Sequence, residues 1–383
     1  MMRQQMKPNT HSRTRGLALA VCLACGATAV PSLAHHPIQA KFEISEETTL
    51  SGIVTNVDWS NPHAHIFVNV TEGDTTLNWA IEVESPVLLR AGGWNSDTLR
   101  PGDHITVTGP IARNGTRQVW GESVVLTATG RQVFTLDDLA PVKPLAKRPA
   151  PRSDDGKVAL GATAGTIDGY WAFPTEKALV EDGVEVEMDQ YGQLADLSDA
   201  AKVAPLQPWA LGLYQHRQER ELQNDPVYLN CKPPGGPRQY QSDLGIKLLE
   251  DKPGERVFVL LGSGNHNYRI IYLDGRDASG QVGGDDNNPL YYGRSLGEWE
   301  GDDTLVVTTT GFNEDFWFSN GGLPHTNLLS MEERFSRPDA DTLHYEVTID
   351  DPGAYTRPWT ASWDLQWVGG EELPVHFCQD NRP

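Results

Sequence analysis

The sequence predicts a mostly β protein of two folded domains preceded by a short leader, and three observations support this class. The length of 383 residues fits two or three domains. The 37 glycines and 26 prolines indicate many turns, and eleven Trp, eleven Tyr and ten Phe favour β structure over a helical bundle. The third observation is a series of short alternating apolar segments separated by turn residues, described below.

The charge balance limits the possible partners. Lys and Arg total 31 against 52 Asp and Glu, which gives a formal net charge of −21. A surface of this sign repels phosphate backbones, so we expect no nucleic-acid partner.

Residues 1–34 have the layout of a secretory signal peptide. Basic residues without any acidic residue precede an apolar run at 16–30 and a small-residue cleavage site ending at Ala34. The run is shorter than the roughly 20 residues of a spanning helix, so we expect a periplasmic or secreted protein with no membrane span. A lipobox at Cys22 or Cys25 is the alternative.

Export changes what the cysteines are expected to do. Cys22 and Cys25 leave with the leader, and Cys231 and Cys378 remain in an oxidising compartment. We predict a Cys231–Cys378 disulfide that ties the chain end to the second domain. Two buried free thiols are the alternative.

Residues 41–134 are predicted to form the first domain. Alternating apolar residues indicate strands at 50–57, 65–70, 77–83, 104–108 and 119–126. A short helix is expected after the third strand, with Ser85 as N-cap and Pro86 at the first helical position. Five strands with a helix between the third and the fourth predict an OB-like five-stranded barrel.

A proline-rich and basic segment at 135–157 is expected to act as a semi-extended linker. Residues 158–383 then predict a larger antiparallel β domain, either a closed barrel or a sandwich. Within it we expect a helix at 208–222, strands at 256–262, 266–273, 304–310 and 343–349, and a hairpin at Asp274-Gly275. With Gly169-Tyr170-Trp171 as its opening strand, this domain resembles a lipocalin-like barrel.

The mature N-terminus suggests a copper site. Cleavage after Ala34 leaves a chain that begins with His35, whose α-amine and imidazole can both bind a metal. His63 and His65 lie two residues apart at a strand entrance, so either of them can complete three nitrogens, a donor set that suits Cu(II). Two ordinary edge-strand histidines beside a flexible terminus are the alternative.

Acid and base candidates gather in the second domain. His266, Tyr268 and Tyr272 are expected on one strand face with Arg269 on the other, and His325 is followed by Glu333. These residues suggest a lyase, isomerase or hydrolase. Surface hydrogen bonding or a satisfied core network is the alternative, because the sequence has no complete nucleophile, phosphate-binding or metalloprotease signature.

Binding is the leading functional interpretation, with a small polar-aromatic or saccharide ligand in the second domain and copper as the possible metal. The expected ligand contacts are Tyr272, Trp299 and Trp363. In the last strand Trp359, Trp363 and Trp367 share a face, as core residues or as a ligand platform. An envelope interaction protein without a small ligand is a third interpretation.

Several motifs carry a resemblance to known sequences. In the first half they are Ala34-His35-His36-Pro37, Asn61-Pro62-His63, Asn78-Trp79-Ala80 and Leu99-Arg100-Pro101-Gly102-Asp103, and in the second half Gly297-Glu298-Trp299-Glu300-Gly301-Asp302 and Glu333-Arg334-Phe335. Residues 34–134 resemble an uncharacterised family of exported bacterial proteins, and residues 158–380 resemble a second uncharacterised exported β-rich family. The resemblance implies export and a β-rich fold, and it implies no catalytic residue.

Overall fold

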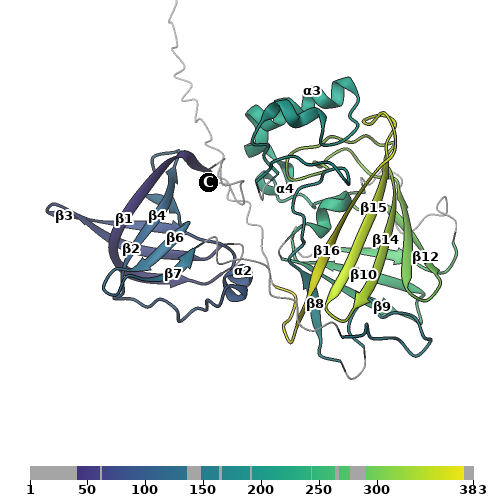
Figure 1. The fold of residues 1–383 in the computed structure, drawn as a ribbon, viewed down its shortest axis with the longest axis horizontal. Coiled ribbons are helices and arrows are strands. Elements are labelled where there is room, and N and C mark those ends of the chain that lie inside the picture. The colour runs from purple at the N-terminus through teal and green to yellow at the C-terminus, as the bar shows by residue number, and fades with distance from the viewer. Residues whose placement is uncertain are drawn as a thin grey trace, which may run out of the picture.

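The computed structural model describes residues 41–60, 63–135, 148–163, 166–189, 192–242, 244–263, 267–276 and 290–374. The predicted signal peptide, His35, His266 and Cys378 lie outside these ranges. Figure 1 shows two separate sheet systems, one in the purple and blue N-terminal part of the chain and one in the teal-to-yellow remainder. The mostly β, two-domain fold class is therefore confirmed.

The first domain is a ring of strands extended at one edge. Its elements are β1 Phe42–Asp58, β2 His65–Glu72, β3 Thr75–Glu82, α2 Pro86–Ala91, β4 His104–Ala112, β5 Gln118–Trp120, β6 Ser123–Leu126 and β7 Arg131–Thr135. The sheet order is β1-β2-β3-β5-β4-β6-β7, and an additional β1–β4 pairing closes the first five strands. With β3 and β5 parallel and α2 between β3 and β4, this is the order of an OB-like barrel.

One long strand makes this closure possible. β1 pairs with β2 near its C-terminal end and with β4 along most of its length, and its register shifts between Glu43 and Glu47 and between Val54 and Asn56. Such bulges bend a strand and increase its twist, so β1 can pair with β2 and with β4 and thereby close the ring. The interior contains buried aliphatic residues together with Trp79, Trp94 and Phe134.

Local signals in this domain are realised except at the last predicted strand and at β7 Arg131–Thr135, which the sequence did not predict. The Leu88 amide donates to Ser85 Oγ at 3.3 Å, which confirms the N-cap of α2. The strand expected at 119–126 is instead split into β5 and β6. A Cβ on Gly121, between them, would lie 2.9 Å from the side chains of Ile81 and Val83, so the chain crosses the core closely at this point.

The second domain is a closed nine-stranded barrel, so of the two expected architectures the barrel is confirmed and the sandwich is wrong. Its strands are β8 Gly169–Ala172, β9 Ile246–Asp251, β10 Arg256–Leu261, β11 Tyr268–Tyr272, β12 Arg294–Glu300, β13 Thr304–Thr310, β14 Ser330–Asp339, β15 Thr342–Asp350 and β16 Trp359–Gly369. Around the barrel the order is β10-β11-β12-β13-β14-β15-β16-β8-β9. The opening strand β8 thus pairs with the last strand, β16.

The barrel is antiparallel except at one place. β11 and β12 run parallel, with Ile271 opposite Ser295, and the predicted Asp274-Gly275 hairpin is therefore wrong. Parallel neighbours need a crossover connection, and the chain between these two strands runs from 273 to 293. Asp274 instead accepts from the Arg276 side chain in an exposed turn.

Helical segments between β8 and β9 fill one region of this domain. They are η2 Leu197–Ala201, α3 Pro208–His216, η3 Arg217–Glu221, η4 Leu222–Asn224, α4 Pro226–Leu229 and η5 Gly236–Tyr240. The helix expected at 208–222 corresponds to α3, which continues as a π-helical turn in η3. All residues of η5 are buried, and the Tyr240 ring packs 4.6 Å from that of Tyr345 on β15.

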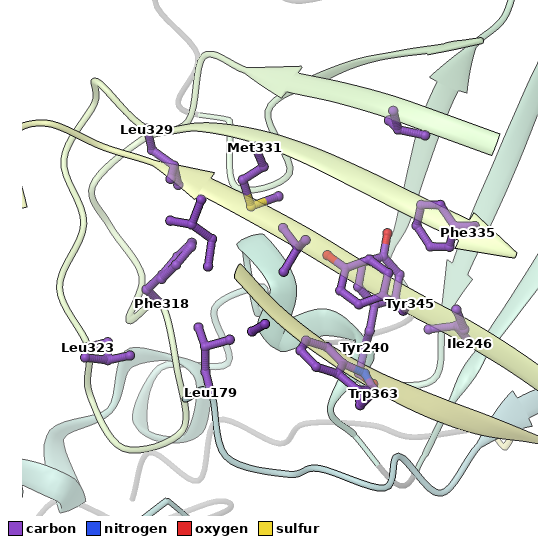
Figure 2. Close-up of a cluster of buried hydrophobic side chains, with 14 of the residues drawn as sticks. Leu179, Tyr240, Ile246, Phe318, Leu323, Leu329, Met331, Phe335, Tyr345 and Trp363 are labelled. Atoms are coloured by element: carbon purple, nitrogen blue, oxygen red, sulfur yellow. The ribbon is translucent and has the colours of Figure 1, made fainter. Parts of the chain in front are cut away.

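The barrel core is aromatic. Figure 2 shows Tyr240, Tyr345 and Trp363 grouped together, with Phe335 nearby on β14. The predicted one-face stripe on β16 is confirmed, because Trp359, Trp363 and Leu365 are buried and alternate with half-buried polar residues. Tyr240 therefore fills part of the barrel interior from a segment outside the sheet.

Part of the expected linker contacts the barrel. The Ala340 amide donates to the Arg148 carbonyl, and the Arg148 side chain pairs with Asp341 at 2.5 Å. Arg152 likewise pairs with Asp303 at 2.5 Å. Among the described residues, no helix combines the length and the apolar character needed to cross a bilayer.

Candidate functional site

A buried carboxylate between two histidines is the first domain's main polar cluster. Glu82 ends β3, and its neighbours across the sheet are His65 at the start of β2 and Trp120 at the end of β5. Glu82 Oε2 lies 3.7 Å from His65 Nε2, and Glu82 Oε1 lies 3.9 Å from His63 Nε2. The Glu82 side chain is only 6% exposed, whereas His63 and His65 are 21% and 32% exposed.

Aromatic rings and a lysine hold this cluster in place. The His63 ring meets the Trp120 ring edge-on, with 5.3 Å between centroids, and the His65 ring stacks on Phe67 at 6.4 Å. Lys41 Nζ donates to Glu82 Oε2 at 2.6 Å. The structure therefore brings the two predicted metal ligands His63 and His65 to one carboxylate, at the place where the described chain begins.

His35, the third predicted metal ligand, lies outside the described residues. Within those residues, no group of three or more His, Cys, Asp or Glu side chains could hold a metal ion as it stands.

Arg269 and Glu333 form a second buried polar cluster, inside the barrel. Arg269 donates to Ser295 Oγ at 2.8 Å, Tyr240 Oη at 2.6 Å and Thr309 Oγ1 at 2.6 Å, and it forms a bidentate pair with Glu333. These contacts use all five guanidinium donors. Burial alone would lower the pKa of Arg269, but the Coulombic attraction of Glu333 and the other contacts raise it.

The hydrogen-bonding positions of Glu333 are also all occupied. Besides Arg269, it accepts from Thr309 Oγ1 at 2.8 Å and from Tyr345 Oη at 3.0 Å, so four acceptor positions are engaged. Both side chains of the pair are at most 1% exposed. Arg269 and Glu333 therefore have no hydrogen-bonding position left for a substrate, which favours a role in the core network.

The other predicted acid and base residues are dispersed. Tyr268 is 57% exposed on the outer face of β11, opposite in direction to buried Arg269. His325 is buried, with Nε2 3.1 Å from the Phe316 carbonyl and Nδ1 3.3 Å from the Thr326 carbonyl. His266 lies outside the described residues. The His325 ring packs against the rings of Phe316 and Phe318.

The three expected ligand contacts also lie apart. The Arg276 guanidinium covers the Tyr272 ring at 3.8 Å, and Lys157 lies 5.7 Å from the ring of partly buried Trp299. Trp363 is 3% exposed and donates from Nε1 to the Tyr240 carbonyl at 3.3 Å. The binding of a small polar-aromatic or saccharide ligand by the second domain stays a prediction.

Sequence reasoning missed Glu82, Lys41 and Trp120. In β3, Trp79 and Ile81 alternate into the core, and this period gives no reason to expect the next residue, Glu82, to be buried as well. The signal that could have found it is the two-residue turn Gly73-Asp74, which fixes the β2–β3 register and sets Glu82 opposite His65.

The comparisons with known proteins give one match. Residues 22–120 match the model of a family of unknown function (DUF6152), in agreement with the expected resemblance to an uncharacterised family. No curated protein and no solved structure matches the chain. The matched stretch contains His35, His63, His65, Glu82 and Trp120, so the whole first cluster lies in the part of the chain that resembles this family.

Proposed function

We propose that this chain is an exported protein whose first domain binds Cu(II). Removal of residues 1–34 leaves the α-amine and imidazole of His35 as two nitrogen ligands. The imidazole of His63 or His65 supplies the third. Nitrogen ligands in this number suit Cu(II), which also binds most tightly among the divalent first-row metals.

The observation that carries the proposal is the position of Lys41. Its ammonium is 2.6 Å from Glu82, and both histidines lie within 4 Å of that carboxylate. His35 lies six positions before Lys41, and six extended residues span about 20 Å. A mature N-terminus at His35 is therefore within reach of both imidazoles.

The electrostatic surroundings favour a cation. The carboxylate of Glu82 lies between the two imidazoles, and the whole chain carries a net charge of −21. A negative surface raises the local concentration of cations, while the Lys41 ammonium already balances the Glu82 carboxylate in the structure.

The test is Cu(II) titration of the mature protein. The full chain is expressed with its own leader, the N-terminal residue is established by mass spectrometry, and Cu(II) affinity is measured against a competing chelator. We expect one Cu(II) per chain, and an affinity at least about tenfold lower for His63→Gln or for His65→Gln. His104→Gln is the control, because His104 lies at the start of β4 opposite Ile53.

Two outcomes contradict the proposal. A mature chain that begins at a residue other than His35 removes the first two nitrogen ligands. Cu(II) binding that the double variant His63→Gln/His65→Gln does not weaken places the metal elsewhere.

A further inference from the structure

The outer face of the first domain carries a row of uncharged side chains that contact one another from strand to strand. The strands β3, β2, β1, β4 and β6 are neighbours in this sheet (Figure 1). Between β2 and β3, Thr71 Oγ1 lies 3.2 Å from Thr76 Oγ1. Between β1 and β4, Ser51 Oγ lies 2.9 Å from Thr106 Oγ1, which lies 3.2 Å from Thr127 Oγ1 directly after β6. None of these side chains is charged, although the whole chain carries a net charge of −21.

Two asparagines on this face are held in one orientation. Asn78 on β3 is paired with Asn69 on β2, and Asn78 Nδ2 donates to Asn69 Oδ1 at 2.9 Å and to Thr55 Oγ1 at 3.2 Å. Thr55 Oγ1 in turn donates to the Phe67 carbonyl at 3.1 Å. The described residues provide no partner for Asn78 Oδ1 or for Asn69 Nδ2. A hydrogen-bond acceptor and a donor therefore lie next to each other on this face, in positions that their neighbours fix.

An aromatic ring lies beside this amide pair. Phe67 and Asn69 share the outer face of β2, because both alternate with buried aliphatic residues. The residue opposite Phe67 on β3 is Ala80, whose methyl group is too small to cover the ring. The His65 ring stacks on the Phe67 ring with 6.4 Å between centroids, and the Phe67 side chain is half-buried. The face thus combines a fixed ring with fixed polar groups.

We infer that this face of the first domain binds a neutral saccharide through the Phe67 ring and the amide groups of Asn69 and Asn78. The C–H groups on one side of a pyranose pack on the negative face of an aromatic ring. Neighbouring sugar hydroxyls both donate and accept, so they match one Oδ1 acceptor beside one Nδ2 donor. The negative charge of the chain repels acidic sugars. The hydroxyl row on β1 and β4 offers contacts for further sugar units, and the inference does not depend on Cu(II) binding.

The test is calorimetric titration of the exported full-length chain with oligosaccharides. The neutral probes are cellohexaose, maltohexaose and the hexamer of N-acetylglucosamine, and the acidic probe is the hexamer of galacturonic acid. We expect at least one neutral probe to bind with a dissociation constant below about 1 mM. We expect the acidic probe to bind at least about tenfold more weakly.

Substitutions locate the bound saccharide. Phe67→Leu keeps an apolar side chain without the ring, so affinity should fall about tenfold, whereas Phe67→Tyr should retain it. Asn78→Ala removes the acceptor and releases Asn69, so affinity should fall about fivefold. The matched control is Asn114→Ala, an exposed asparagine between β4 and β5 that accepts from the Thr116 amide, and it should change affinity less than twofold. Thermal unfolding of each variant verifies that it is folded.

Three outcomes overturn the inference. The first is that no neutral probe binds with a dissociation constant below about 1 mM. The second is equal affinity for the acidic probe, which contradicts the neutral class of ligand. The third is binding that Phe67→Leu and Asn78→Ala both leave unchanged, which places the saccharide on another surface.

Discussion

Arg269 has a side chain of a type found in catalytic sites, yet in this structure it stabilises the core of the barrel. Its five donors are all engaged, and so are the acceptor positions of Glu333. The sequence identified both residues only as acid and base candidates, Arg269 on a predicted strand and Glu333 a few residues after His325. It could not show that they pair, since they are 64 positions apart and meet only when the barrel closes.

The first prediction concerns this pair. Arg269→Met leaves the Glu333 carboxylate buried and unpaired, and we expect the free energy of unfolding to fall by about 3 to 5 kcal/mol. Urea unfolding measures it. Arg357→Met, which breaks an exposed pair with Glu181, is the control and should leave the urea midpoint unchanged. An Arg269→Met midpoint equal to that of the wild type would show that the network contributes nothing.

The second prediction concerns pH and His325. Burial lowers the pKa of His325 from its ordinary value of 6.5, and the carbonyls of Thr326 and Phe316 and the charges of Asp351 and Glu314 oppose this only in part. Below pH 6.5 the unfolded chain therefore binds a proton that the folded chain excludes. The free energy of unfolding then falls as pH decreases from 6.5 toward the folded pKa, by at most about 1.4 kcal/mol per pH unit.

Urea unfolding between pH 5.5 and 7.5 measures this slope in the wild-type chain and in His325→Gln. The variant should lose less stability than the wild type over the acidic part of the range. Identical slopes would contradict the assignment. The two chains are compared because Glu122 and Glu250, whose pKa values burial raises, change the stability of both in the opposite direction.

At the scale of elements, the first domain shows which local signals were sufficient to predict a helix or a strand. The Ser85-Pro86 start of α2 needs only neighbouring residues, and the structure confirms it. The division of the last predicted strand at Gly121 depends on contacts with Ile81 and Val83 of another element. The parallel pairing of β11 with β12 could not be predicted from the sequence either, because Asp274-Gly275 has the same local chemistry in a hairpin and in a crossover.

The third prediction tests a close approach between elements. Gly109 on β4 has a φ of 156°, and a Cβ there would lie 1.8 Å from the Trp120 carbonyl oxygen. Gly109→Ala should therefore separate β4 from β5 and lower the free energy of unfolding by about 2 to 3 kcal/mol. The control is Gly115→Ala, where φ is +74° but the added Cβ meets nothing within 4 Å.

Thermal unfolding of the two glycine variants gives the comparison. We expect Gly109→Ala to have the lower midpoint, because it combines a clash with backbone strain. Equal midpoints would show that the β4–β5 contact adapts to a methyl group.

At the scale of the whole molecule, composition and strand periodicity were enough to predict two β-rich domains. They could not predict that Tyr240, from a segment outside the sheet, occupies the barrel beside Tyr345 and Trp363 (Figure 2). Periodicity describes each strand by itself, and the filling of a barrel depends on segments that have no regular period. The small-ligand site expected there therefore stays a prediction.

The fourth prediction is the Cys231–Cys378 disulfide. Cys378 lies outside the described residues, so the pairing is tested in solution. The intact mass of the exported chain should be two hydrogens below that of the reduced chain, with no thiol open to alkylation. Reduction should lower the free energy of unfolding by about 2 to 5 kcal/mol. Two alkylatable thiols in the unreduced, unfolded protein would contradict the pairing.

The most direct measurement of the central claim is the electron paramagnetic resonance spectrum of the mature chain with one equivalent of Cu(II). We predict nitrogen hyperfine splitting from the His35 amine, the His35 imidazole and one further imidazole, and a loss of the amine contribution when the α-amine of His35 is acetylated. A spectrum of aqueous Cu(II), or one that acetylation leaves unchanged, would contradict a copper site built on the histidine-headed terminus.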